Sequence, residues 1–365
     1  MCPPSWPPGG YPISMLGIDR RAARYTFTAV MVILLLDVLY LIRITLFIFI
    51  LALLFGYLLS PLVNLLDRVL PGNRTRTPAL AMAYVIFVGL AVLVGIEIGT
   101  RVVEEATKLS KELPMEVKTW VNTPGPSATF NEFKQKIAEA VNAALSTNLL
   151  SALPQVSMKF LALLSNLIYV VVIPILAFFF LKDGRTLREH LLDLVEDGPH
   201  RALLDDVLAD IHLLLAHYMR ALFLLSLAAF VAYAIFFAIT GMPYGVLLAA
   251  LACMLEFIPM IGPFTAGVVI LLIALVAQSH VLAILIFLLA YRVFQDYILS
   301  PHLMEQGVEL HPLLVLFGVF AGAEIAGIAG TFLSVPVLAL VRIIYIRIRK
   351  VRLGARLGTA PPVAV

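Results

Sequence analysis

The sequence predicts an all-α, polytopic membrane protein with about six to eight membrane segments, two of which are re-entrant helical hairpins in an inverted repeat. Of its 365 residues 61% are hydrophobic and only 13% are charged, whereas soluble domains are roughly 25% charged. The apolar stretches are long enough to cross a hydrocarbon core of about 30 Å, and lysines and arginines cluster at their edges. Two of the stretches are interrupted by glutamate, proline and glycine, which predicts the hairpins.

The N-terminal region begins with a segment rich in proline and glycine and then in arginine, residues 1–25, which we expect to be disordered and cytoplasmic. It does not resemble a signal peptide, because the apolar run that follows is too long and lacks a small-residue cleavage site. That run, residues 26–66, carries only Asp37 and Arg43 as charges. As one helix it would be about 60 Å long, so it predicts two spans that turn near these charges.

Two further spans complete a predicted N-terminal scaffold of residues 26–181. They cover residues 78–99 and 160–181, and Pro174 predicts a kink in the second. The polar insertion between them, residues 101–157, contains six basic residues and six glutamates and has helical spacing. We expect it to form surface helices outside the membrane.

Charged segments flank the remaining apolar region. Residues 182–211 combine leucines at helical intervals with charges, which predicts a pair of amphipathic interfacial helices broken at Gly198. Residues 342–365 hold six basic residues and no acid, which predicts a cytoplasmic tail. With the arginines that precede residue 26, this distribution places both termini in the cytoplasm.

Residues 212–341 are the predicted transport region. Each of its two spans is followed by a broken apolar segment, residues 244–277 and residues 312–341. The limbs of these segments would be about 17 to 21 Å long as helices, too short to cross. As hairpins they enter from opposite faces, an inverted repeat common in secondary transporters. The alternative is that each is one kinked span, which gives eight spans.

The candidate substrate-binding or coupling residues lie at these breaks. Ionisable groups and non-helical backbone inside a membrane are costly and are tolerated beside a cavity. Each glutamate could bind substrate or carry a proton, or it could only cap the broken helix. The prolines and glycines could expose backbone groups to a ligand. The candidates are Glu256, Pro259, Gly262 and Pro263 at the first break, and Glu324 and Gly327 at the second.

Two other positions have structural and functional alternatives. Asp296 follows Arg292 by four residues, the helical spacing of an ion pair, although Asp296 could instead contact the substrate. His311 precedes the second broken segment and is either solvated or a proton sensor. The sequence contains no nucleotide loop, catalytic motif or spaced metal ligands, so we expect no enzyme activity, no cofactor and no metal. A net charge of +3 gives no reason to expect nucleic acid as a partner.

Several motifs resemble those of a known family, over about residues 27–346. The motifs are PILAFFFLKDG at 174–184, EFIPMIGP at 256–263, DYILSP at 296–301 and LHPLLVLFGVFAGAEIAGIAG at 310–330, followed by Pro336. In order and spacing they resemble the autoinducer-2 exporter family of bacterial membrane proteins, also called PerM-like permeases. One departure is HYMRAL at 217–222, where Ala221 and Leu222 replace the glycine and glutamine usual in the family.

The resemblance implies a secondary transporter in the bacterial inner membrane that exports a small polar molecule such as autoinducer-2. It further implies a homopentamer whose protomers work independently by an elevator motion, with both hairpins at the substrate site. Sodium or lithium/proton antiport is the alternative that the family also suggests. An oligomeric channel or membrane scaffold is a second alternative. The expected partners are therefore the solute or ion, the lipid bilayer and further copies of the chain.

Overall fold

A computed structural model describes residues 20–69, 77–146, 167–303 and 310–357, and within these ranges it is helical without strands. Five of the described helices are long and apolar enough to cross a membrane, at residues 24–41, 43–60, 199–240, 281–303 and 312–351. The predicted all-α, polytopic membrane fold is confirmed. Predictions for residues 1–19, 147–166, 304–309 and 358–365 lie outside the described residues. The chain divides into two compact units, residues 1–51 and 52–365.

The first unit contains α1 (Arg20–Leu41) and the first turns of α2 (Arg43–Val69). The helices are separated only at Ile42, within the region where we predicted a turn. Helical hydrogen bonding continues across this point, because the Ile42 N–H donates to Val38 O at 3.0 Å and the Leu46 N–H donates to Ile42 O at 2.9 Å. The two helices therefore meet without a loop.

The second unit begins with the rest of α2 and continues through α3 (Thr77–Asn122), α4 (Ala128–Ser146) and α6 (Leu167–Asp193). The expected span at 78–99 and the start of the polar insertion form one helix, α3. Lys134 of α4 is 3% exposed and donates to the carbonyl oxygens of Trp120 at 3.0 Å and Thr123 at 2.8 Å. Its ammonium group thereby satisfies carbonyls at the C-terminal end of α3 and fixes α4 beside it.

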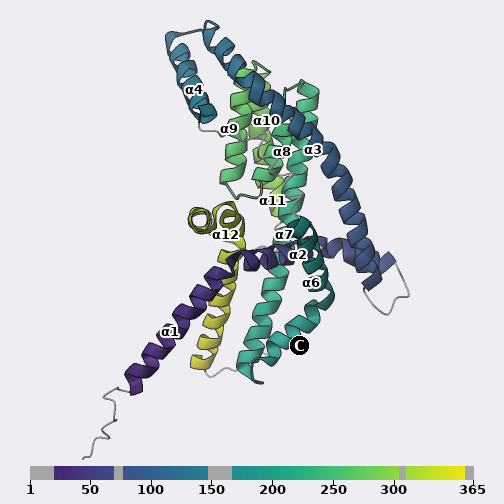
Figure 1. Ribbon diagram of the computed structural model, residues 1–365, viewed down its shortest axis with the longest axis vertical. Coiled ribbons are helices and arrows are strands. Elements are labelled where there is room, and N and C mark those ends of the chain that lie inside the picture. Colours follow the sequence, from purple (N-terminus) through teal and green to yellow (C-terminus); the bar gives the residue numbers. More distant parts are fainter. Residues whose placement is uncertain (1–19, 70–76, 147–166, 304–309, 358–365) are drawn as a thin grey trace, which may run out of the picture. The chain divides into compact units, whose positions relative to one another are not determined.

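The main core forms where α3 packs on α8 (Gly245–Leu255) and α9 (Ile261–Val276) of the transport region (Figure 1). α7 (Pro199–Thr240) packs against α8, and α10 (Val281–Phe294) packs against α9. From α3 this core includes Leu109, Leu113, Val117 and Trp120, which recur at intervals of three and four residues. The polar insertion thus has an apolar face that is buried against the first broken segment.

The chain continues from α10 through η1 (Gln295–Leu299) and α11 (Ser300–Leu303), and the last described helix is α12 (Pro312–Leu357). α12 is interrupted at Ala326 and Gly327, whose backbone is not helical. A Cβ atom on Gly322 would collide with the carbonyl oxygen of Gly330, which a straight helix would hold about 12 Å away. The limbs on the two sides of the interruption therefore pack against each other.

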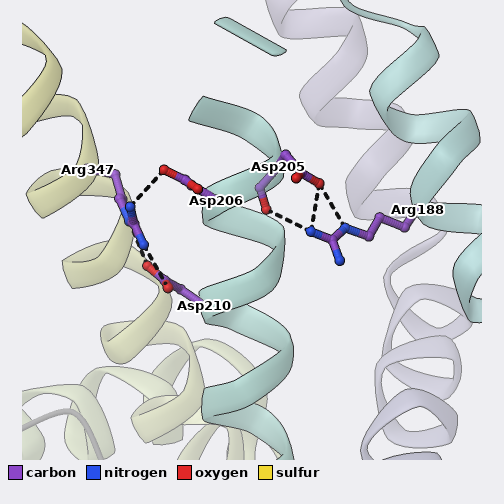
Figure 2. Close-up of polar contacts among 5 residues, drawn as sticks. All are labelled: Arg188, Asp205, Asp206, Asp210 and Arg347. Atoms are coloured by element: carbon purple, nitrogen blue, oxygen red, sulfur yellow. Dashed lines mark hydrogen bonds and ion pairs between the residues drawn. The ribbon is translucent and has the colours of Figure 1, made fainter. Parts of the chain in front are cut away.

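Ion pairs join α7 to α6 and to α12 (Figure 2). Arg347 of α12 bonds both carboxylate oxygens of Asp210, at 2.7 and 2.9 Å, and also reaches Asp206 at 2.8 Å. Arg188 of α6 pairs with Asp205 at 2.7 Å. The three aspartates lie in the polar first part of α7, so this part connects the two neighbouring helices.

Replacing Arg347 by methionine should lower the free energy of unfolding by about 1 kcal/mol, and the melting temperature of the detergent-solubilised protein by a few degrees. The bidentate geometry favours an effect, but the Arg347 side chain is 28% exposed and solvent screens the pair. Arg349→Met is the matched control, because Arg349 is exposed on the same helix. Equal melting temperatures for the two variants, at low and high salt alike, would show that the ion pairs contribute nothing measurable.

Candidate functional site

A cavity of about 280 Å³ lies among α7, the first helix break, the α10–η1–α11 segment and α12, all within the second unit. Its wall is largely apolar, with contributions from Leu222, Met260 and Pro336. The polar side chains are few and come from three of these elements: His217, Tyr218, Glu256, Arg292, Gln295, Asp296 and Ser300. A mostly apolar cavity with a small number of polar groups is the usual form of a small-molecule site.

The first helix break supplies the Glu256 carboxylate to this cavity. Glu256 is the C-cap of α8, and its N–H still bonds the carbonyl oxygen of Ala252 at 3.1 Å. The chain then reverses within a few residues, because Met260 has a positive φ of 64° and the Gly262 N–H bonds Ile258 O at 3.0 Å. Pro259 and Pro263 line the cavity on either side of this turn.

The π-helical turn η1 positions the group that binds Glu256. Its carbonyl at Gln295 accepts from the N–H of Ser300, five residues later, in place of the usual four. Gln295 is 4% exposed, and its amide nitrogen donates to Glu256 Oε1. Turns of this kind inside α-helices are often found at functional sites. Here the turn connects the first break to α10.

Arg292 and Asp296 form the ion pair that their spacing predicts, with an N–O distance of 2.8 Å. Both side chains line the cavity and both are less than half exposed. The cavity therefore contains two carboxylates and one guanidinium group, and each of the three groups has a partner within the described residues. This arrangement is unfavourable for an anionic solute.

The structure does not bring all the predicted site residues together. Glu324 and Gly327 lie exposed at the interruption of α12 and are not among the cavity-lining residues. Gly262 is buried in the first turn of α9, between Pro259 and Pro263 in the chain, and does not line the cavity.

His311 has a structural role in the described residues. Its Nδ1 accepts from the N–H of Leu313 at 3.2 Å, and its carbonyl oxygen accepts from Leu314 at 2.9 Å. These bonds satisfy two amides in the first turn of α12, so the residue acts as an N-terminal cap.

Sequence reasoning missed four polar residues of the cavity, one of which is Ser300 in the DYILSP motif at 296–301. Gln295 could have been found from the sequence, because it is a polar residue next to Asp296 within an apolar stretch. Tyr218 and His217 are in the HYMRAL segment, in which Ala221 and Leu222 differ from the residues usual in the family. Of these last two, Leu222 lines the cavity, whereas Ala221 is 1% exposed and packed within α7.

α3 holds the start of the first broken segment through glutamates. Glu105 accepts from the N–H of Leu247 at 2.8 Å, which caps the first turn of α8 from outside that helix. The hydroxyl of Tyr244 donates to Glu112 at 2.7 Å and lies 3.5 Å from Glu116. Burial and then the charge of Glu112 raise the pKa of Glu116, while the Tyr244 hydroxyl opposes this rise.

Acidification should therefore stabilise the contact between α3 and α8. Folding raises the pKa of Glu116. The resulting stabilisation of the folded protein is therefore present in full when the pH lies below the pKa of Glu116 in the unfolded chain, and it is lost as the pH rises through the pKa of Glu116 in the folded protein. We expect Glu116→Gln to melt at a higher temperature than the wild type near pH 8, and the difference to shrink as the pH falls toward 5. Thermal melts of both proteins across this range measure it.

Glu104→Gln is the control for this experiment, because Glu104 is exposed on the same helix. It should follow the wild type at every pH. A Glu116→Gln difference that stays constant with pH would contradict the expected titration of Glu116.

Comparison with known proteins identifies the family. Residues 29–350 match the model of a family described as AI-2E family transporter. YueF of Bacillus subtilis, a candidate transport protein, is 24% identical over 321 residues, which cover 82% of this chain and 84% of the relative. MT0215 of Mycobacterium tuberculosis, also a candidate transport protein, is 29% identical over 300 residues and covers 79% of each chain. Since the family match spans most of the chain, this multi-pass membrane protein belongs to the AI-2E family of transporters and has a role in membrane transport.

Proposed function

We propose that the protein is a secondary transporter that exports a small polar molecule similar to autoinducer-2 through the cavity beside the first helix break. The observation that carries this proposal is the lining of that cavity. It combines residues of two discontinuous segments, such as Glu256 and Pro336, with residues of the π-helical turn. Sites between discontinuous helices are typical of secondary transporters.

The residues assigned to the solute follow from the same lining. Glu256 and Asp296 supply hydrogen-bond acceptors, Arg292 supplies donors, and Pro259 and Pro263 shape the wall. Gly262 supports this wall by permitting the tight turn. The second break, with Glu324 and Gly327, contributes its limbs to the cavity and not its tip.

Transport in this proposal follows an elevator motion within a homopentamer in the bacterial inner membrane, with both termini in the cytoplasm. The family resemblance supports this part of the proposal. The broken segments at 244–277 and 312–341 act as re-entrant hairpins, in agreement with the short α8 and α9 helices and the close limbs of α12. Membership of a transporter family favours transport over enzyme activity.

Sodium or lithium/proton antiport is the second candidate, and the two carboxylates of the cavity favour it. Glu256 and Asp296 offer the oxygen ligands that hard cations prefer, and an acid at such a site can exchange a cation for a proton. An oligomeric channel is the third candidate.

Flux measurements in proteoliposomes distinguish these functions. The purified protein is reconstituted, and uptake of labelled autoinducer-2 and of ²²Na⁺ is followed with and without an imposed proton gradient, against protein-free liposomes. We expect saturable uptake of autoinducer-2. Saturable sodium uptake alone would establish the antiporter instead, and single-channel current without saturation would contradict any carrier.

A further inference from the structure

Tyr218 lines the cavity, and its hydroxyl has no hydrogen-bond partner among the described residues. The oxygen is buried, although the side chain as a whole is only partly so. A buried hydroxyl without a partner is unfavourable, since it has lost its bonds to water and gained none in return. Such a group in a native protein calls for an explanation.

The charged side chains of the cavity already have hydrogen-bond or ion-pair partners. Glu256 accepts from Gln295, and Arg292 pairs with Asp296 at 2.8 Å. Three buried side-chain polar atoms lack partners within the described part of the chain, on Glu116, Tyr218 and Tyr291, and of these residues Tyr218 alone lines the cavity.

The ring of Tyr218 is held in place by apolar packing between α7 and α12. It contacts a cluster that includes Leu215 and Met219 of α7 with Ala339 and Ile343 of α12. The neighbouring His217 is also fixed, because its Nδ1 lies 2.8 Å from the carbonyl oxygen of Leu213. The hydroxyl is thus presented by a constrained side chain, which lowers the entropic cost of binding a ligand.

We propose that Tyr218 is a solute-binding residue whose hydroxyl hydrogen-bonds a hydroxyl or carbonyl oxygen of the transported molecule. This inference rests on the proposed function of the cavity. A phenol can both donate and accept, so it suits an uncharged polar solute. The excess of carboxylates in the cavity is consistent with that class, since it disfavours anions. Tyr218 therefore selects solutes that carry an oxygen at this position.

Two isosteric variants test the assignment. Tyr218→Phe removes the buried hydroxyl of a cavity-lining residue, and Tyr291→Phe removes a similarly buried hydroxyl of a residue that does not line the cavity. The probe is autoinducer-2, whose uptake into proteoliposomes gives KM and the maximal rate. We expect Tyr218→Phe to raise KM about tenfold with little change in the maximal rate, as for a lost neutral hydrogen bond. Tyr291→Phe should leave both values unchanged.

Thermal melting without solute provides the second measurement. If the hydroxyl serves only the solute, Tyr218→Phe should melt at or above the wild-type temperature, because it removes an unsatisfied buried group. Unchanged KM in Tyr218→Phe, or an equal rise in both variants, overturns the assignment while the transport function stands. A Tyr218→Phe variant that melts well below the wild type overturns it in favour of a structural role. A wild-type protein that transports no autoinducer-2 removes both the function and the assignment.

Discussion

Replacing Glu256 by glutamine should lower solute flux by about ten- to a hundredfold while the protein stays folded. This decrease in flux corresponds to the loss of a hydrogen bond between the solute and a charged group, which is worth roughly 1.5 to 3 kcal/mol. The fold should tolerate the change, because the glutamine oxygen can still accept from the amide of Gln295. The new side chain can neither carry a charge nor release a proton, so the pH dependence of flux should also flatten.

Glu324→Gln provides a matched control at the other helix break. The chemistry of the substitution is the same, but Glu324 is exposed and does not line the cavity. Flux of labelled autoinducer-2 and thermal melting should be measured for both variants at several pH values. If Glu256→Gln transports like the wild type with the same pH profile, Glu256 only caps α8.

The helix breaks could be predicted from the sequence because their signals are local. Proline, glycine and a glutamate within an apolar stretch disrupt helical hydrogen bonding wherever the stretch is packed. The structure has interruptions at Glu256–Met260 and at Ala326–Gly327, inside the two segments expected to be broken. The spacing of Arg292 and Asp296 is local in the same way, since four residues bring two side chains together on any helix.

The packing of α3 on the transport region could not be predicted, because it depends on contacts between distant residues. Glu105 and Leu247 are 142 residues apart, and Glu112 and Tyr244 are 132 apart. Charges at these positions indicated only a polar surface helix. Their apolar neighbours at helical spacing show which face is buried, but not what covers it.

The partner of Glu256 was missed for a related reason. The predicted pairing of Arg292 with Asp296 rests on an α-helical register, whereas the structure has a π-turn from Gln295 to Leu299. Such a turn changes the direction of every following side chain, and no residue type specifies it. The sequence therefore indicated a carboxylate beside a cavity without indicating the amide that binds it.

The turn of the first break depends on the absence of a side chain at Gly262, so Gly262→Ala should strongly destabilise the protein. A Cβ atom there would overlap the backbone carbonyl of Leu255, the last residue of α8, and the Cβ of Ile258 is 3.3 Å away. Backbone atoms cannot move aside as a flexible side chain could, so α8 and α9 would have to separate. Overpacking of this kind costs roughly 1 to 3 kcal/mol or more.

Gly267→Ala, five residues along the same helix, isolates this effect. A Cβ atom at Gly267 meets nothing within 4 Å, so the substitution should be neutral or should stabilise α9 by up to about 1 kcal/mol through helix propensity. Melting temperatures in detergent and autoinducer-2 flux should be compared for the two variants. Gly262→Ala should lower both, since the displaced turn also moves Pro259 and Pro263 in the cavity wall. Two alanine variants that melt and transport alike would show that the turn relaxes without cost, and the close approach of Leu255 to Gly262 would then not be what shapes the cavity.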